Sequence, residues 1–177
     1  MVNDRSRIGQ TAPAPLEPVR ALLNSWLIPN ESREPTDLFG DFAREHGWTA
    51  RESARVRELR THLRHMVETG QVEADALNRW IAKCDLRPRV DEGELVYSHD
   101  GGPASALLAA VVCAIGDGSW KRLKACPDCR WVFYDNTRNG SKRWCLMYAG
   151  GPEGRACGTI AKVRRYRDRQ AAAGKAV

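Results

Sequence analysis

The sequence predicts a mainly α fold, in which a helical N-terminal part with one small β-hairpin precedes a short, cysteine-rich C-terminal part. Three observations lead to this prediction. Apolar residues recur at three- and four-residue spacing between Leu16 and Cys84, which is typical of amphipathic helices. An apolar run over residues 104–115 is interrupted only by Ser105, so a buried helix is expected there. Four of the six cysteines follow residue 118.

The composition is that of a globular chain. Its 177 residues, 42% apolar and 28% charged, suit one ordinary domain with a small one attached. The longest apolar run is shorter than the about 20 residues that a membrane span needs, and the N-terminus, Met-Val-Asn-Asp-Arg, opens no apolar signal segment. We therefore expect no membrane association, no secretion and a cytoplasmic location, where cysteines typically bind metal or lie buried.

Helices account for most of residues 16–118, which we expect to form one helical domain behind a flexible leader, residues 1–15. The first helix carries apolar residues at helical spacing and stops at Pro29: Leu16, Val19, Leu22, Leu23, Trp26 and Leu27. Thr36 is expected to cap a short second helix that ends near Gly47.

Two longer helices and the hairpin come next. Thr49 and Glu52 form a capping-box pattern that opens a helix closed by Gly70, and another helix runs to Cys84. Residues 89–97 are expected to form the hairpin, which turns at an Asp-Glu-Gly segment.

The central buried helix is expected to start at Pro103 and to continue past Gly116 through Trp120 and Leu123. The expected core packs its apolar residues against those of the two helices before the hairpin: Leu107, Leu108, Val111 and Val112 against Leu59, Leu63, Leu77, Trp80 and Ile81.

The cysteines of the last third have the spacing of metal ligands. A CxxC pair, Cys126 and Cys129, is followed by Cys145 and Cys157. Because a structural Zn²⁺ ion takes four thiolate or imidazole ligands in a closed tetrahedron, we predict one zinc ion held by these four residues. A redox dithiol is the less favoured alternative, since no thioredoxin-like βαβ context is present. The other two cysteines are predicted to be buried thiols on apolar helical faces: Cys84 and Cys113.

The segment between these cysteines has a β-type pattern. Residues 131–134 are expected to form a strand, residues 135–140 a turn, and Arg143-Trp144 the returning strand. A CxxC turn, a hairpin and then a basic helix that begins at Cys157 are arranged as in treble-clef-like zinc modules. Four protein ligands leave zinc no open position for water, so we expect no catalytic residue and no enzyme activity.

Positive charge is concentrated in the same third. Residues 119–177 hold 14 Lys/Arg and four Asp/Glu, whereas residues 1–118 hold 14 and 18. This asymmetry favours contact with nucleic acid, although a merely solvated basic face is the alternative. The expected contacts are basic residues of the hairpin and of the helix over residues 158–173: Arg138, Lys142, Arg143, Lys162, Arg164, Arg165, Arg167 and Arg169.

Apolar residues of this part are assigned to packing. Ile160, Val163 and Tyr166 recur every third position and are expected to face the zinc module. Four aromatic residues could stack on bases, but core packing is favoured for them: Trp131, Phe133, Tyr134 and Trp144.

Residues 126–147 resemble the bacterial CGNR zinc-finger family. The CxxC pair is followed by a Phe-x-Asp-x-Thr segment and by Arg-Trp-Cys-x-Met, and Cys157-Gly158 matches the start of the Cys-Gly-Asn-Arg motif. The helical part, residues 16–118, is similar to the N-terminal ABATE domain of that family, and residues 119–177 to its zinc finger with a basic C-terminal helix. The resemblance implies a stress-induced transcriptional regulator that binds DNA.

The chain departs from the family at two places. Thr159-Ile160 replaces the Asn-Arg of the motif, and a glycine-rich insert covers roughly residues 148–156. The sequence therefore predicts a DNA-binding regulator with a structural zinc site and a helical domain that senses a small ligand or a partner. A homodimer is expected, because one zinc module makes few phosphate contacts. The alternative is a protein-interaction or small-molecule-binding protein whose zinc module is only structural.

Overall fold

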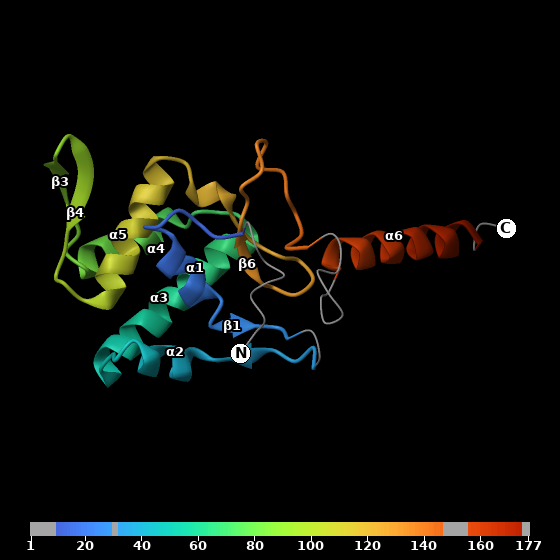
Figure 1. The fold of residues 1–177 in the computed structure, drawn as a ribbon, viewed down its shortest axis with the longest axis horizontal. Helices are drawn as coiled ribbons and strands as arrows, with labels where there is room; N and C mark the ends of the chain where they lie inside the picture. The colour runs from blue at the N-terminus through green and yellow to red at the C-terminus, as the bar shows by residue number, and fades with distance from the viewer. Residues whose placement is uncertain (1–9, 30–31, 147–155, 175–177) are drawn as a thin grey trace.

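The structure, a computed structural model, describes residues 10–29, 32–146 and 156–174 (Figure 1). The described part holds six α-helices: α1 Glu17–Leu23, α2 Phe39–Glu45, α3 Ala50–Thr69, α4 Ala74–Lys83, α5 Pro103–Gly116 and α6 Cys157–Gly174. It also holds three antiparallel two-stranded sheets: β1 Trp26–Leu27 with β2 Thr36–Asp37, β3 Arg87–Asp91 with β4 Glu94–Ser98, and β5 Leu123–Ala125 with β6 Val132–Tyr134. The predicted mainly α fold is confirmed.

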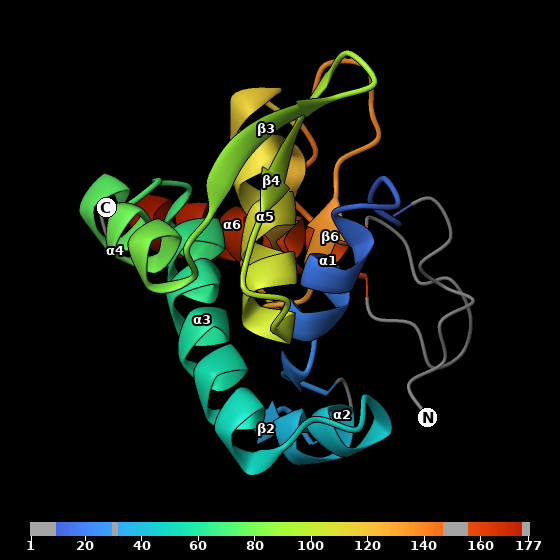
Figure 2. The ribbon, with the colours of Figure 1, turned by 90° about the vertical axis from the view of Figure 1, so that its left-hand side faces the viewer.

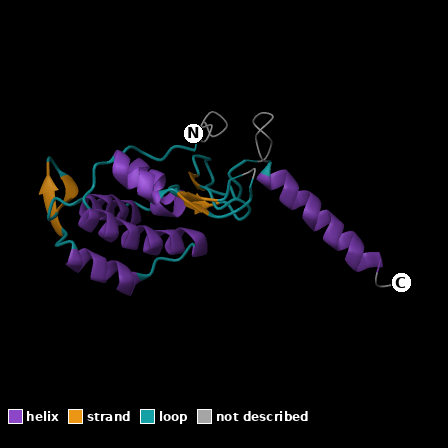
Figure 3. Ribbon diagram, turned by 90° about the horizontal axis from the view of Figure 1, so that it is seen from below, coloured by secondary structure: helices purple, strands orange, loops and turns teal. Residues whose placement is uncertain are grey.

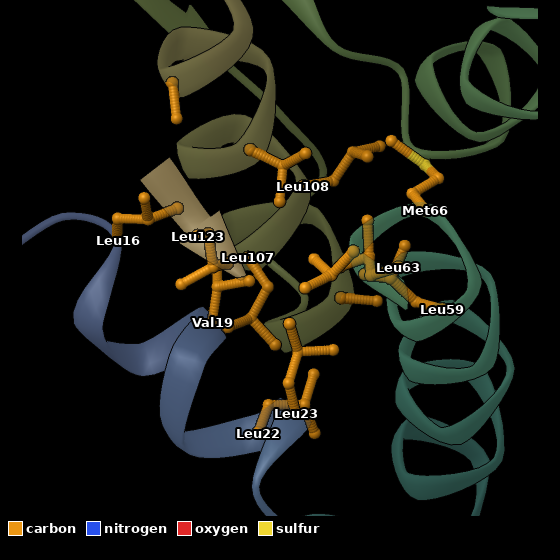
Figure 4. Packing of buried hydrophobic residues seen from close by; sticks show 14 of the residues in the cluster. Leu16, Val19, Leu22, Leu23, Leu59, Leu63, Met66, Leu107, Leu108 and Leu123 are labelled. Carbon is orange, nitrogen blue, oxygen red and sulfur yellow. The ribbon is translucent and has the colours of Figure 1, made fainter. Parts of the chain in front are cut away.

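Helix α5 is the centre of the core and lies between α1 and α3 (Figure 2). Leu108 and Val111 of α5 are fully buried. Figure 4 shows the labelled leucines of α1 and α3 on either side of α5, which carries Leu107 and Leu108. The expected core is confirmed for six residues: Leu59, Leu63, Trp80, Leu107, Leu108 and Val111. Leu77, Ile81 and Val112 are only partly buried at its margin.

The ends of α3 follow the local sequence signals. Thr49 Oγ1 accepts a hydrogen bond from the Glu52 amide at 3.3 Å, and the Glu52 carboxylate accepts one from the Thr49 amide at 2.8 Å. This capping box satisfies two amides that the first turn leaves unpaired. Gly70 ends the helix at φ +70°, a left-handed conformation that glycine adopts without a Cβ clash.

The first helix is shorter than predicted. It ends at Leu23, and the Trp26–Leu27 segment pairs with Thr36–Asp37 instead of continuing as helix. The buried Arg64 guanidinium donates hydrogen bonds to the Leu23 and Trp26 carbonyl oxygens at 2.6 and 3.0 Å, which stabilises the extended path. A tertiary contact, which local spacing does not report, thus overrides the helical pattern.

Thr36 accordingly lies in a strand and does not cap α2. The N-cap position of α2 is Leu38, and the carboxylate of Asp37, just before it, accepts a hydrogen bond from the Phe39 amide at 2.9 Å. The Arg60 guanidinium binds the same carboxylate at 2.7 Å and fixes it beside α3. Asp37 therefore joins the start of α2 to the core.

The β3–β4 hairpin turns at Glu92–Gly93, within the predicted Asp-Glu-Gly segment, and stands at the end of the molecule opposite α6 (Figure 3). Helix α5 ends earlier than predicted, at Gly116. Gly118 has φ +78°, so the helix cannot continue to Trp120. Trp120 instead opens a short 3₁₀ turn, η2 Trp120–Arg122, that leads into β5.

One side of the β5–β6 hairpin packs into the helical core. Leu123, Val132 and Tyr134 are buried in the same cluster as the α5 leucines. The Asn24 side chain, at the end of α1, pairs with the Val132 backbone as both donor and acceptor, each at 2.8 Å. The expected division after residue 118 stays a prediction, but the two parts share these contacts.

The predicted leader is described from Gln10 onward, and there it packs on the hairpin. Gln10 is 1% exposed, and its carbonyl accepts a hydrogen bond from the Tyr134 amide at 3.0 Å. Among the described residues, no helix is both long and apolar enough to cross a membrane.

Candidate metal centre

The first two cysteines lie on the turn that joins β5 to β6. The Cys126 amide donates to the Trp131 carbonyl at 2.9 Å, and the Arg130 amide donates to the Cys126 carbonyl at 2.8 Å. Arg130 adopts φ +59°, which turns the chain back sharply after Cys129. Such a tight turn presents both thiols on one side.

The hairpin that carries this turn differs from the prediction. Val132–Tyr134 pairs with Leu123–Ala125, which precedes the CxxC pair, and Arg143-Trp144 is not a strand. The apolar side of β5 explains the difference, because Leu123 is 4% exposed and packs into the helical core. A three-residue strand has little local signal, so its pairing is decided by this tertiary packing.

Asp135 organises the loop that delivers Cys145. Its Oδ1 accepts hydrogen bonds from the Thr137 amide at 3.0 Å and hydroxyl at 2.6 Å. Its Oδ2 accepts from the Lys142 amide at 2.7 Å and from the Lys124 ammonium at 2.8 Å. Burial opposes ionisation of this fully buried carboxyl, yet Lys124 and Thr137 lower its pKa to about 2. The loop is therefore closed around one buried carboxylate.

Two basic residues of the preceding segment complete this network. Lys124 Nζ also donates to the Gly140 carbonyl at 2.5 Å. Arg122 donates to the Asp135 carbonyl at 2.9 Å and to the Thr137 carbonyl at 2.7 Å. The sequence analysis did not predict that Asp135 closes this loop. The local signal was present, because an Asp that follows an apolar strand and opens a turn often accepts hydrogen bonds from the backbone of that turn.

The last two cysteines are placed by backbone contacts. The Gln10 side-chain amide donates to the Cys145 carbonyl at 2.9 Å, from 135 residues away in the sequence. The Gly158 amide donates to the Leu146 carbonyl at 2.9 Å, which holds the first turn of α6 against the segment after Cys145. Cys157 is the first residue of α6, as predicted.

The four predicted ligands come together in one buried cluster. The sulfur atoms of Cys126, Cys129, Cys145 and Cys157 all lie within 4.8 Å of one another, and each residue is at most 3% exposed. The Cys129–Cys145 and Cys145–Cys157 sulfur pairs are 3.5 and 3.7 Å apart. A disulfide requires about 2.05 Å, so these are separate thiols. A zinc tetrahedron with bonds of about 2.3 Å places its sulfurs about 3.8 Å apart, and the cluster fits it.

The electrostatics of the cluster also suit a cation. Hydrogen bonds from the thiols of Cys129 and Cys145 lower the pKa of Cys126 far below its usual range. The pKa values of Cys145 and Cys157 are raised, because each thiol donates a hydrogen bond to the Cys126 sulfur and is buried. The pKa of Cys129 is lowered as well. A hydrogen bond with Cys126 opposes this shift in pKa, but hydrogen bonds from Cys145 and Cys157 outweigh it. Two thiolates are thus favoured, and ionising the other two thiols needs a compensating positive charge, which a divalent metal supplies.

Three of the four aromatic residues pack as the sequence favoured. Trp131, Phe133 and Tyr134 are 9%, 0% and 7% exposed, and the first two enclose the cysteine cluster. Trp144 also contacts the cluster but is only partly buried. Of the remaining cysteines, Cys84 is fully buried and Cys113 is half-buried.

Helix α6 projects away from the rest of the molecule (Figures 1 and 3). Every residue from Lys162 to Ala171 is exposed. The expectation that Val163 and Tyr166 face the zinc module is wrong, since they are 41% and 57% exposed. The helix leaves the cysteine cluster at its first turn, and only Ile160 of the three apolar residues remains half-buried.

The structure places the eight predicted nucleic-acid residues in different settings. Five are exposed on α6: Lys162, Arg164, Arg165, Arg167 and Arg169. Arg143 is exposed and lies over the Trp144 ring at 5.4 Å. Lys142 is half-buried, with its ammonium 5.4 Å from the centre of the Phe133 ring. Arg138 is exposed on the loop after Asp135, where its carbonyl accepts a hydrogen bond from Arg122 at 3.4 Å.

Comparison with known proteins agrees with this geometry. Residues 122–170 match the family model of the CGNR zinc finger. The match includes β5, all four cysteines and most of α6. The expected insert lies, apart from Ala156, outside the described residues. No curated protein matches the chain. The chain thus carries a zinc-finger domain, similar over residues 122–170 to the CGNR zinc finger, with a buried four-cysteine cluster as its candidate metal site.

Proposed function

We propose that this chain is a DNA-binding transcriptional regulator, in which one structural zinc ion holds a basic helix in position to contact DNA. The observation that carries the proposal is the projection of α6. It presents five basic residues and one acidic residue, Asp168, beyond the body, and every residue from Lys162 to Ala171 is open to solvent. A cationic helix whose side chains are exposed in the described part of the structure is expected to have a partner of opposite charge.

The dimensions of α6 support the same partner. An α-helix with its side chains is about 10–12 Å wide, which matches the about 12 Å width of the DNA major groove. Its arginines offer planar groups for phosphates and guanine edges. Because Val163 and Tyr166 do not pack on the protein, the exposed stretch from Lys162 to Ala171 is available to a groove.

The metal in this proposal is structural and not catalytic. Zinc, when bound, would replace the mutual repulsion of buried thiolates by attraction and so fix the four sulfurs. Cys157 would then anchor the start of α6 to the β5–β6 hairpin, which the helical core holds in turn. The direction of α6 would follow from the cysteine cluster, and the protein would need no enzyme activity.

A truncation tests the proposal. A chain that ends at Ala161 keeps all four cysteines and loses the exposed part of α6. We expect it to retain its metal and its melting temperature but to lose measurable affinity for a fluorescent DNA duplex at moderate salt. Equal affinities of the two chains, at equal metal content, would overturn the proposal.

A second candidate function rests on a hollow in the helical part. A space of about 240 Å³ lies between α1, α2 and α5 and is lined by Phe42, Trp48, three prolines and one polar ring, that of His46. Such a lining suits a small planar apolar molecule. In this reading residues 16–118 are the ABATE-like sensor domain that the sequence resembles.

The hollow is tested by filling it. Ala106→Phe places a ring in the space, because Ala106 lines it from α5. Aromatic compounds that raise the melting temperature of the unmodified chain should no longer do so in this variant. If no compound in an aromatic panel shifts the unmodified chain, the sensor reading fails.

The proposal includes a homodimer, because one helix contacts few phosphates and two linked helices gain by avidity. Sedimentation of the metal-loaded chain with and without DNA tests it. A monomer in both states would remove the dimer from the proposal.

A further inference from the structure

Of the described aromatic residues beside the cysteine cluster, Trp144 is the one that is only partly buried. Trp131 and Phe133 are buried, whereas Trp144 is partly exposed at the surface of the cluster. In the sequence it stands between Arg143 and the ligand Cys145.

A hollow lies between the Trp144 ring and the first turns of α6. It has a volume of about 320 Å³ and is lined, besides Trp144, by Gly158, Ala161, Lys162, Arg165 and Arg169. Next to the ring the helix contributes only the small residues Gly158 and Ala161, so space remains beside the part of the indole that lines the hollow. The Arg143 guanidinium lies 5.4 Å from the centre of the ring. Lys162, Arg165 and Arg169 then follow along the same side of the helix over about 10 Å.

A second hollow of about 300 Å³ on another side of Trp144 has a different charge. It is lined by Arg164 and Arg165 but also by Asp128 and Asp168. These carboxylates repel phosphate, whereas the described lining of the first hollow holds no acidic residue. An anionic ligand with a flat ring is therefore directed to the side of Lys162 and Arg169.

We propose that this hollow binds one unpaired nucleotide of a DNA strand, with its base stacked on Trp144 and the adjoining phosphates on Lys162, Arg165 and Arg169. The inference rests on the proposed DNA binding and adds the kind of DNA that is bound best. A base inside an intact duplex has both faces stacked, so only a bulged, frayed or single-stranded base can reach the indole. The stack is indifferent to sequence, because every base has a π face.

Three DNA probes of one sequence test the proposal with the full, metal-loaded chain. The first is a fully paired duplex, the second carries a single bulged nucleotide, and the third carries an abasic residue at the bulge. We expect the bulged probe to bind at least about fivefold more tightly than the other two, the lower limit for one stacked base. The abasic probe keeps the distorted backbone, so it separates stacking from DNA flexibility.

Two substitutions at Trp144 separate the ring face from packing. Trp144→Phe keeps an aromatic face and should keep most of the preference for the bulge. Trp144→Leu keeps apolar contact with the cluster but removes the face, and should bring the bulged probe to the affinity of the abasic one. Zinc content is measured for both, so that loss of the metal site is not mistaken for loss of stacking.

A third substitution leaves Trp144 in place. Ala161 lines both hollows, and Ala161→Leu fills the space over the ring with a good helix former. It should also abolish the preference, whereas the matched control Ala171→Leu, exposed further along α6, should not.

The outcomes distinguish this inference from the function on which it rests. Salt-dependent binding of all three probes with equal affinity would overturn the Trp144 site and leave DNA binding intact. The same holds if Trp144→Leu, with its zinc retained, weakens the paired duplex as much as the bulged one. If none of the three probes is bound, both the Trp144 site and the proposed DNA binding are overturned.

Discussion

At the residue scale, the four cysteines could be predicted from the sequence and the groups that place them could not. The CxxC spacing and two later cysteines identify the ligands because a closed zinc site needs four of them. Gln10 and Asn24 give no such signal: each is an ordinary polar residue whose backbone partner lies more than 100 residues away. Asp135 is intermediate, since its contacts with Thr137 and Lys142 are local but that with Lys124 depends on the β5–β6 pairing.

Asp135→Asn should destabilise the protein at neutral pH. The folded protein lowers the pKa of this carboxyl to about 2, from about 3.9 in an unfolded chain. The charged form is therefore favoured in the folded state, by roughly 2–3 kcal/mol, above about pH 4, and that stabilisation is lost as the pH falls through about 2.

Urea unfolding of both proteins between pH 7 and pH 2 checks this prediction. The difference between them should be constant down to about pH 4 and then shrink. Asp168→Asn, at an exposed position on α6, is the control and should change little. A difference that grows as the pH falls would show that the Asp135 carboxylate does not have this role.

Cys145→Ser should abolish tight zinc binding. Serine keeps the size of the side chain but replaces a thiolate ligand by a weak hydroxyl donor. Metal analysis after dialysis should give one zinc per chain for the unmodified protein and much less for the variant, with most helical signal kept. Cys113→Ser, outside the cluster, is the matched control and should keep its zinc. Full zinc retention by Cys145→Ser would remove this residue from the site.

At the element scale, prediction succeeded where the signal is local. The capping box and Gly70 gave both ends of α3, and the Asp-Glu-Gly segment gave the turn of the β3–β4 hairpin. It failed for β1, β2 and β5, which are two or three residues long and follow tertiary partners such as Arg64. It also failed for Val163 and Tyr166 of α6, which were expected to face the zinc module. Periodicity identifies an apolar stripe on a helix but does not show whether another part of the protein covers that stripe.

Helix α6 should depend on the metal for its order. Its residues from Lys162 to Ala171 are exposed in the described part of the structure, and an isolated helix of this length is marginal in water. Removal of zinc by a chelator should therefore reduce the helical circular dichroism in proportion to the 18 residues of α6, while the near-ultraviolet signal of the core remains. Zinc should restore the loss. An unchanged helical signal in the metal-free chain would show that α6 is stable by itself.

At the scale of the whole molecule, the helical core and the metal centre are one structure. The β5–β6 hairpin buries Leu123 and Val132 among the leucines of α5 and α3, and holds Cys126 and Cys129 at its tip. A division of the sequence after residue 118 describes its composition and charge well. It does not reveal this shared hairpin, since composition carries no information on packing across a boundary.

Leu108→Ala should therefore affect both parts. Leu108 is fully buried in α5, and its truncation should cost about 2–5 kcal/mol of unfolding free energy. Because the hairpin shares this core, zinc should also be released at a lower temperature, as followed by a metal-sensitive dye during a thermal melt. Val90→Ala, at a position 72% exposed, is the control and should change stability by less than about 0.5 kcal/mol. An unshifted melt of Leu108→Ala would contradict this account of the core.

The most direct test of the proposed function is the salt dependence of DNA binding. Each phosphate neutralised by a basic side chain releases counterions, so the slope of log affinity against log salt counts the contacts. Replacing Arg164, Arg165 and Arg169 by alanine should weaken binding and reduce the slope by about one unit per contact removed, with zinc still bound. The control removes the same charge from exposed arginines of the body, Arg51, Arg79 and Arg89, and should leave the slope unchanged. If both triple variants show the slope of the unmodified chain, α6 is not the DNA contact and the central claim is wrong.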